Sequence, residues 1–145
     1  MSVKSDNTDI DQEKKSPENK QEKSAGAKVL LVEDDPLILK MYHAKFQNEG
    51  FNVVVSEDGV HGLQMVTEQK PDIILLDIMM PQMSGIDFLK KLRATEAGKK
   101  IPVLVLTNLS EKEEEQEATT LGIKEYLLKA SLTPAEIVEK VKKYV

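Results

Sequence analysis

The sequence predicts an α/β fold of five parallel strands, each followed by a helix. From Lys28 onward, short apolar runs alternate with longer segments of helical period, which is typical of this fold class. Several of the runs are apolar at successive positions, as expected for strands that are covered on both faces of a parallel sheet. The predicted strands are Val29–Val32, Val53–Val55, Ile73–Leu76, Val103–Leu106 and Tyr126–Leu128.

Helices are predicted after each strand, and local signals mark their ends. Asp35, which a proline follows, is a candidate N-cap, and Thr133 begins a capping box ahead of the last helix. Ser110 begins another capping box, and Gly50 and Gly122 stand where helix C-terminal glycines belong. The predicted helices span residues 36–49, 59–69, 84–95, 110–121 and 134–144.

The composition excludes several classes of function. The chain has 145 residues, with 20 Lys and Arg against 25 Asp and Glu, and no Cys. This length leaves room for one domain and an appendage, and the net charge of −5 disfavours nonspecific nucleic-acid binding. Without Cys there is no disulfide scaffold, thiolate zinc site or cysteine nucleophile. Because the sequence shows no secretory signal and no apolar stretch of the roughly 20 residues that span a bilayer, we expect a cytoplasmic protein without nucleic-acid or membrane partners.

The first 26 residues differ sharply in composition from the rest. Residues 1–26 hold 5 Lys and 6 Asp and Glu, and their branched aliphatic residues are Val3 and Ile10. Such a segment cannot bury enough apolar surface to offset the entropy that it would lose on ordering. We therefore predict a disordered polar tail over residues 1–26 and one domain over residues 27–145.

Polar residues follow the predicted strands at their carboxyl ends. Open parallel sheets gather these ends along one edge, where such sheets bind ligands, so the side chains are expected to lie together. Glu33, Asp34 and Asp35 follow the first strand, and Asp77 follows the third. Thr107 and Asn108 follow the fourth strand, and Lys129 follows the fifth.

These residue types in one place indicate phosphoryl transfer. Neighbouring carboxylates are costly unless a cation compensates them, and Mg²⁺ prefers such hard oxygen ligands. The absence of Cys and of a nearby His pair argues against zinc. Lys129 offers a positive charge, and Thr107 a hydroxyl, to phosphoryl oxygens. Asp77 follows a strand that should be central, and it is the predicted nucleophile because aspartyl phosphates are an established covalent species.

Four motifs make the sequence resemble the receiver domain of two-component response regulators. They fall in the order and spacing of that family, and the resemblance covers residues 28–145. It implies a flavodoxin-like three-layer sandwich with strand order 2-1-3-4-5. The motifs are Val29-Leu30-Leu31-Val32-Glu33-Asp34-Asp35-Pro36, Leu75-Leu76-Asp77-Ile78-Met79-Met80-Pro81-Gln82-Met83-Ser84-Gly85, Leu106-Thr107 and Tyr126-Leu127-Leu128-Lys129.

The resemblance also implies a role for each matching residue. Asp77 is expected to accept a phosphoryl group from a phosphohistidine on a sensor histidine kinase or a histidine phosphotransfer protein. Asp34 and Asp35 match the acidic pair that binds Mg²⁺, with Asp35 the more direct ligand and Met79 contributing its backbone carbonyl. Lys129 matches the lysine of the family's site. The residues that match the family's switch are Thr107 and Tyr126.

The resemblance implies signalling by contact rather than turnover. Such a protein assists its own phosphorylation and dephosphorylation, is not a turnover enzyme, and contacts an unknown downstream protein as a monomer or a weak phosphorylation-dependent dimer. One position departs from the family pattern, because Ala130 follows Lys129 where the family usually has proline in a cis peptide. We expect this loop to differ from the usual conformation, since a cis bond before a non-proline residue costs about 2.5–4 kcal/mol.

Three other interpretations stay open at this point. A pseudo-receiver would bind partners without phosphorylation, although the acidic set is complete. A metal-dependent phosphohydrolase with an aspartyl nucleophile typically carries a second Asp two residues later, where this chain has Met79. A dinucleotide- or flavin-binding domain would have a glycine-rich loop after the first strand, where this chain has Asp34, Asp35 and Pro36.

Overall fold

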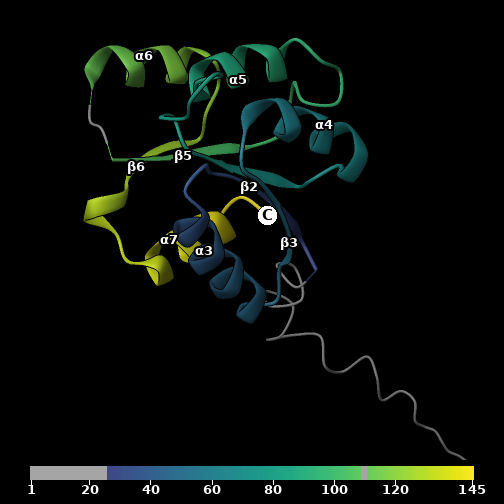
Figure 1. Ribbon diagram of the computed structural model, residues 1–145, viewed down its shortest axis with the longest axis vertical. Coiled ribbons are helices and arrows are strands. Elements are labelled where there is room, and N and C mark those ends of the chain that lie inside the picture. The colour runs from purple at the N-terminus through teal and green to yellow at the C-terminus, as the bar shows by residue number, and fades with distance from the viewer. Residues whose placement is uncertain (1–25, 109–110) are drawn as a thin grey trace, which may run out of the picture.

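A five-stranded parallel sheet forms the centre of the computed structural model, which describes residues 26–108 and 111–145 (Figure 1). The strands lie in the order β3-β2-β4-β5-β6, so the predicted strand order 2-1-3-4-5 is confirmed. Each strand pairs in parallel with its neighbours. The strands are β2 (Lys28–Val32), β3 (Asn52–Ser56), β4 (Ile73–Leu76), β5 (Val103–Thr107) and β6 (Glu125–Leu128).

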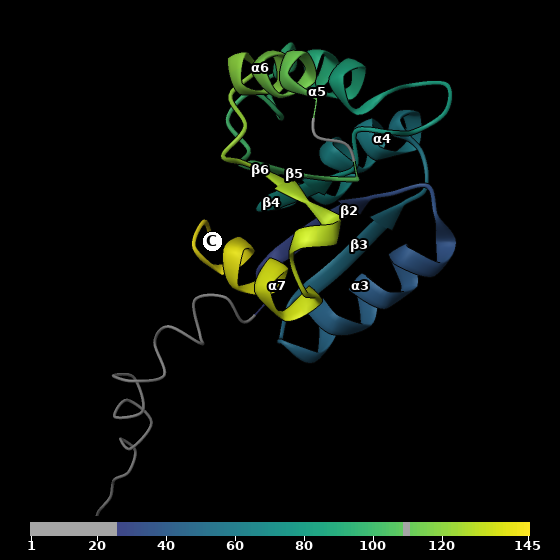
Figure 2. The ribbon, with the colours of Figure 1, turned by 90° about the vertical axis from the view of Figure 1, so that its left-hand side faces the viewer.

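Helices cover both faces of the sheet and complete a three-layer sandwich (Figures 1 and 2). One face carries two helices, and the other carries three. A short 3₁₀ helix, η1 (Lys129–Ser131), joins β6 to the last helix. The first face holds α3 (Pro36–Asn48) and α7 (Pro134–Lys142), and the second holds α4 (Gly59–Gln69), α5 (Gly85–Arg93) and α6 (Lys112–Thr120).

Two apolar cores lie between the sheet and its helices. The core under α3 and α7 includes Phe46 and Ile137, and the core under the other three helices includes Phe88. Alternate residues of β2 contribute to both cores, because Leu31 packs in the first and Leu30 in the second. All residues of β4 are buried. This burial on both faces explains why the strands appear in the sequence as unbroken apolar runs.

All five predicted helices are present, with ends shifted by no more than two residues. Gly50 and Gly122 have φ of 93° and 81°, the left-handed backbone that ends α3 and α6. Asp35 and Thr133 cap their helices as predicted. The amino end of α6 has no side-chain cap hydrogen bond, and Ser110, which was predicted to start this helix, lies outside the described residues.

Three further expectations concern the tail, membrane-spanning helices and the peptide bond after Lys129. The predicted disordered tail over residues 1–26 lies outside the described residues except for Gly26, so the boundary at residue 27 stays a prediction. Within the described ranges, no helix is both long and apolar enough to cross a membrane. The peptide bond between Lys129 and Ala130 is trans, and η1 begins there.

The first residue of α5 lies against the backbone that follows β4. The Gly85 N–H donates to the carbonyl of Ile78 at 2.9 Å. A Cβ at Gly85 would lie 2.6 Å from the Ile78 Cα and 2.7 Å from the Asp77 carbonyl oxygen. Only glycine allows this close approach. Gly85 therefore holds the segment after β4 against the start of α5.

Gly85→Ala should destabilise the protein by roughly 1–3 kcal/mol, because the new methyl group meets backbone atoms that cannot rotate away. Gly59→Ala is the matched control, since Gly59 also begins a helix but its Cβ would meet the flexible side chain of Met83. We expect the control to change stability by less than about 1 kcal/mol. Urea unfolding followed by circular dichroism measures both, and equal free energies for the two variants would contradict the steric argument.

Candidate functional site

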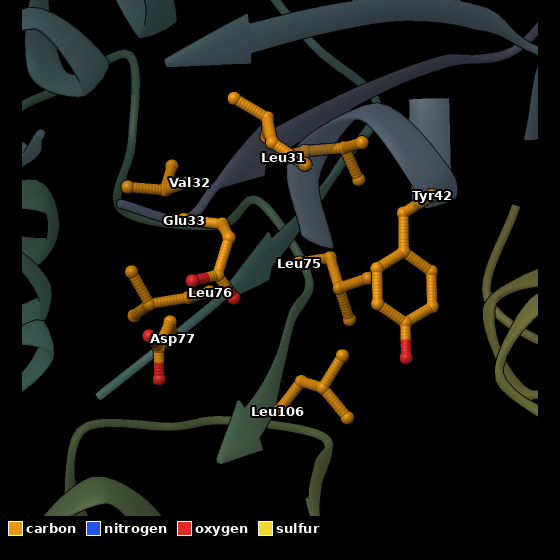
Figure 3. Close-up of a pocket in the computed structure, with 9 residues that line it drawn as sticks. Leu31, Val32, Glu33, Tyr42, Leu75, Leu76, Asp77 and Leu106 are labelled. Carbon is orange, nitrogen blue, oxygen red and sulfur yellow. The ribbon is translucent and has the colours of Figure 1, made fainter. Parts of the chain in front are cut away.

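The carboxyl ends of three strands bring two acidic side chains and one lysine together. Glu33 follows β2, Asp77 follows β4, and Lys129 follows β6. Glu33 and Asp77 are 7% and 5% exposed, and their carboxylates lie close to each other in Figure 3. They meet because β2 and β4 are neighbours in the sheet, and the last residues of these strands, Val32 and Leu76, pair in register.

Lys129 bridges the two carboxylates. Its Nζ donates a hydrogen bond to Glu33 Oε1 at 2.7 Å and lies 3.7 Å from Asp77 Oδ2. Burial alone lowers the pKa of Lys129, but the hydrogen bond to Glu33 and the negative charges of Asp77 and Glu33 raise it above its usual value. The Lys129 ammonium is therefore charged at neutral pH, and it lies closer to Glu33 than to Asp77.

A third carboxylate completes an acidic cluster, which consists of Glu33, Asp34 and Asp77. One oxygen atom from each residue lies within 4.8 Å of the other two. Three carboxylates beside a single ammonium call for a further cation. Carboxylate oxygens are the donors that Mg²⁺ prefers, and the cluster contains no Cys or His ligand for zinc. The donor set of the acidic cluster therefore fits Mg²⁺.

The three acidic residues that follow β2 lie in different surroundings. Asp35, which was predicted to be the more direct metal ligand, is exposed and lies outside the acidic cluster. Its Oδ1 accepts hydrogen bonds from the backbone N–H groups of Leu37 and Ile38 at 2.9 and 3.5 Å, so it caps α3. Glu33 occupies the buried position instead, and its Oε2 accepts from the Asp35 N–H at 3.0 Å.

Glu33 and Tyr42 lie at the site, although the sequence analysis predicted no functional role for either of them. A signal for Glu33 existed, because it is the first acidic residue after the apolar run of β2. Tyr42 is in the middle of α3 and gave no such signal. Together with Glu33 and Asp77 it lines a cavity of about 10 Å³, room for about one water molecule (Figure 3). Burial raises the pKa of Tyr42, and the charge of Lys129 opposes that rise.

The environment of Asp77 makes its carboxyl group unusually easy to protonate. Burial raises the pKa of Asp77 from 3.8 to about 7, the charge of Glu33 adds to this rise, and the charge of Lys129 opposes it. The Met79 backbone N–H donates to Asp77 Oδ1 at 3.2 Å and favours the ionised form, while the Met79 side chain is 52% exposed. A cation bound to the acidic cluster would favour the ionised, nucleophilic carboxylate.

The two residues predicted to form the switch lie in different surroundings. Thr107 ends β5, is 0% exposed, and pairs with Leu128, the neighbour of Lys129 in the chain. Tyr126 lies on β6 and is half-buried; burial first, and then the charge of Glu114 on α6, raises its pKa. Thr107 therefore stands at the edge that carries the acidic cluster, whereas Tyr126 stands beside α6.

Comparison with known proteins identifies one family. Residues 29–142 match the response regulator receiver domain. The polar-differentiation response regulator DivK of Brucella ovis is 30% identical over 117 residues, which cover 81% of this chain and 94% of DivK. The chain also matches longer transcriptional and DNA-binding regulators, and it spans only 32–49% of their length.

Solved structures of receiver proteins share the fold. The chemotaxis protein CheY4 of Vibrio cholerae has a TM-score of 0.78 at 30% identity, over 83% of this chain and 100% of CheY4. The receiver domain of the sensor histidine kinase PA1611 of Pseudomonas aeruginosa has a TM-score of 0.74 at 28% identity, over 83% of this chain and 98% of that domain. In the PA1611 structure a magnesium ion is coordinated in the active-site cleft.

Asp77→Asn should stabilise the metal-free protein more at about pH 8 than at about pH 5. The pKa of Asp77 is raised from 3.8 to about 7 on folding. The stability that protonated Asp77 contributes is therefore complete below the lower value and is lost as the pH rises through the higher one. The uncharged amide avoids this loss, which grows by roughly 1–3 kcal/mol between the two pH values. Thermal unfolding in EDTA at both pH values measures the difference.

Asp87→Asn is the control for that measurement, because it removes a carboxylate from an exposed position of α5. A gain in stability of the same size in both variants would contradict the assignment to burial. A larger gain for Asp77→Asn at the lower pH would also contradict it.

Proposed function

The chain belongs to the response regulator receiver domain family, and on that premise we propose that Asp77 accepts a phosphoryl group from a phosphohistidine. The donor is a sensor histidine kinase or a histidine phosphotransfer protein, and the phosphorylated form signals by contact with another protein. One observation carries this proposal: the buried Asp77 carboxylate lies within the acidic cluster and 3.7 Å from the Lys129 ammonium.

The proposed transfer forms one bond and breaks one bond. An Asp77 carboxylate oxygen bonds to phosphorus while the phosphorus–nitrogen bond of the donor breaks, and its electron pair returns to the imidazole, which takes up a proton from solvent. Lys129 is near enough to balance the charge on one phosphoryl oxygen, and the Thr107 hydroxyl is the donor proposed for another. Catalysis of this kind is mainly positioning and neutralisation of charge.

The proposed metal site uses the acidic cluster. Glu33, Asp34 and Asp77 are the carboxylates that would hold Mg²⁺, and the backbone carbonyl of Met79 remains a predicted ligand. Bound Mg²⁺ would supply positive charge to the phosphoryl oxygens during transfer. This assignment differs from the initial prediction in replacing Asp35 by Glu33. The assignment is supported by the burial of Glu33 and by the capping role of Asp35.

The proposed output of phosphorylation is a shift between two existing arrangements of the switch residues. Thr107 is the residue near the phosphoryl group, and Tyr126 is the residue near α6. α6 is the least buried of the helices, since Ala118 is its one buried residue. An element with so few buried contacts is the part of the signalling face that we expect to move first.

The residue two positions after Asp77 bears on whether the protein turns over a substrate. Hydrolases that use an aspartyl nucleophile typically place an acid/base Asp two residues after it. In this chain Met79 occupies that position, and its exposed side chain has no group that can transfer a proton. The protein is therefore proposed to act as a phosphoacceptor that assists its own reactions and not as a turnover enzyme.

Exposed apolar side chains support docking of the phosphodonor around the acidic cluster. Among the described residues, large hydrophobic side chains with high exposure are found on α3, at the start of α4 and just after Asp77. All of these positions are near the carboxyl edge of the sheet. Apolar groups around a polar centre are typical of protein interfaces. The exposed fractions are 78% for Leu37, 45% for Met41, 56% for Val60 and 52% for Met79.

Incubation with acetyl phosphate and Mg²⁺ should add one phosphoryl group, which intact-mass spectrometry detects. Asp77→Asn should remove the adduct, and Asp34→Asn should slow its formation at least about tenfold by weakening metal binding. Asp35→Asn is the matched control and should react at nearly the wild-type rate, because Asp35 lies outside the acidic cluster. An adduct that persists in Asp77→Asn would overturn the acceptor, and equal rates for Asp34→Asn and Asp35→Asn would overturn the metal assignment.

The double variant Leu37→Ala, Met41→Ala should accept phosphoryl groups from a protein donor at least about tenfold more slowly, because it loses apolar contact area. The donor is the one that reacts fastest with the wild type in a panel of purified histidine kinases and phosphotransfer proteins. Acetyl phosphate provides the internal control, and its rate should not change. If both donors slow equally, the substitutions act on the reaction itself and docking on α3 is refuted.

A further inference from the structure

A groove lined by cations lies at the amino edge of the sheet, opposite to the acidic cluster. Its walls are the loop between α5 and β5 and the turn between α6 and β6, and its volume is about 420 Å³. Arg93, Lys99, Lys100 and Lys124 line it, together with the apolar side chains of Ile101 and Leu121, and no acidic residue is part of the lining. This grouping of positive charge contrasts with the net charge of −5 for the chain.

Arg93 makes the groove rigid. Its Nη1 donates to the carbonyls of Gly98 and Ile101 at 2.9 and 2.8 Å, which fixes the first loop. Its Nε and Nη2 donate to the carbonyls of Leu121 and Gly122 at 2.9 and 3.1 Å, which fixes the second. One side chain therefore sets the distance between the two walls. A preformed groove loses little entropy when it binds a partner.

Most of the positive charge at the groove is not paired with carboxylates among the described residues. Arg93 is half-buried, its hydrogen bonds all go to neutral carbonyls, and burial lowers its pKa. Within the described part of the chain, Lys100 and Lys124 make no ion pair, and Lys99 pairs with Glu96, whose side chain is 91% exposed. Exposed pairs of that kind contribute little. Of the four cations that line the groove, Arg93, Lys100 and Lys124 therefore have no carboxylate partner among the described residues.

Favourable interaction with a helix end accounts for only some of the basic residues that line the groove. Basic residues in the last turn of α5, including Arg93, favourably oppose the negative end of that helix. Lys100 and Lys124 lie outside the helices, however, and their side chains are exposed at the mouth of the groove. Their positions fit recognition of an external anion.

We propose that this groove binds an acidic polypeptide segment of a partner protein that also carries apolar side chains. Ile101 and Leu121 offer apolar contact between the lysines, which suits such a peptide. A compact phosphate group would instead need converging N–H donors, and Arg93 already uses four of its five on carbonyls. The groove and the acidic cluster are at opposite edges of the sheet, so this contact does not depend on Asp77 or on its phosphorylation.

Fluorescence anisotropy with a labelled peptide of Glu and Leu residues, about 12 residues long, tests the proposal at about 50 mM and about 300 mM NaCl. The full chain should bind the peptide, with weaker binding at the higher salt concentration. The variant Lys100→Glu, Lys124→Glu should weaken binding at least about tenfold. Lys40→Glu, Lys112→Glu is the matched control, because it makes the same change of charge at exposed positions outside the groove, and it should weaken binding less than about threefold.

Three results would overturn the proposal: no binding by the wild type, equal weakening in the two double variants, or tighter binding of a single-stranded DNA of the same length. Thermal unfolding confirms that the variants are folded. Phosphorylation by acetyl phosphate, measured on the same samples, should be unchanged in Lys100→Glu, Lys124→Glu. Peptide binding without any phosphorylation of the wild type would remove the proposed phosphoacceptor and leave the groove proposal intact.

Discussion

The buried contact of Glu33 and Asp77 with Lys129 is the constraint on which the rest of the site depends. A single ammonium holds two carboxylates that are less than a tenth exposed, and its hydrogen bond to Glu33 joins residues 96 positions apart. The contact requires β2, β4 and β6 to run parallel, with their carboxyl ends at one edge. Buried charges without partners are costly, so the topology and the ionic contact stabilise each other.

The same contact leaves the site short of positive charge. Asp34 adds a third carboxylate, and the pKa of Asp77 rises to about 7 because of burial and the charge of Glu33. Lys129 lies 2.7 Å from Glu33 but 3.7 Å from Asp77, so its strongest contact is with the residue that is not the proposed acceptor. A cation or a phosphoryl group at Asp77 would change this balance of charges. Such a site is suited to report a change of charge to the elements around it.

The two edges of the sheet are organised differently. The carboxyl edge gathers anionic groups, exposed apolar side chains and the buried hydroxyl of Thr107. The amino edge is held by the hydrogen bonds of Arg93, which fasten the end of α6 to α5 through the carbonyls of Leu121 and Gly122. α6 is therefore anchored at its carboxyl end, and among the described residues no side chain caps its amino end. The carboxyl edge of the sheet therefore carries the proposed reaction site, and the amino edge is held in place by the hydrogen bonds of Arg93.

Most of the fold could be predicted from local patterns in the sequence. Apolar runs and capping residues placed every strand and helix to within two residues, and the residues at the strand ends indicated that Asp77 and Lys129 would meet. These features depend on side-chain periodicity and on caps, which act over a few residues. The strand order came from the resemblance to a family, since periodicity does not encode which strands become neighbours.

Only the tertiary structure decided which two of three consecutive acidic residues join Asp77 in the acidic cluster. All three carboxylates follow β2 in the sequence, and the path of the chain from the end of β2 into α3 decides which of them face Asp77. Glu33 and Asp34 lie in the acidic cluster, whereas Asp35 directly precedes α3 and caps it. The surroundings of Tyr42 and Arg93 also depend on the tertiary structure, because their neighbours come from distant segments of the chain. The sequence by itself determined the elements and the residue types at their ends, and packing determined which side chains meet.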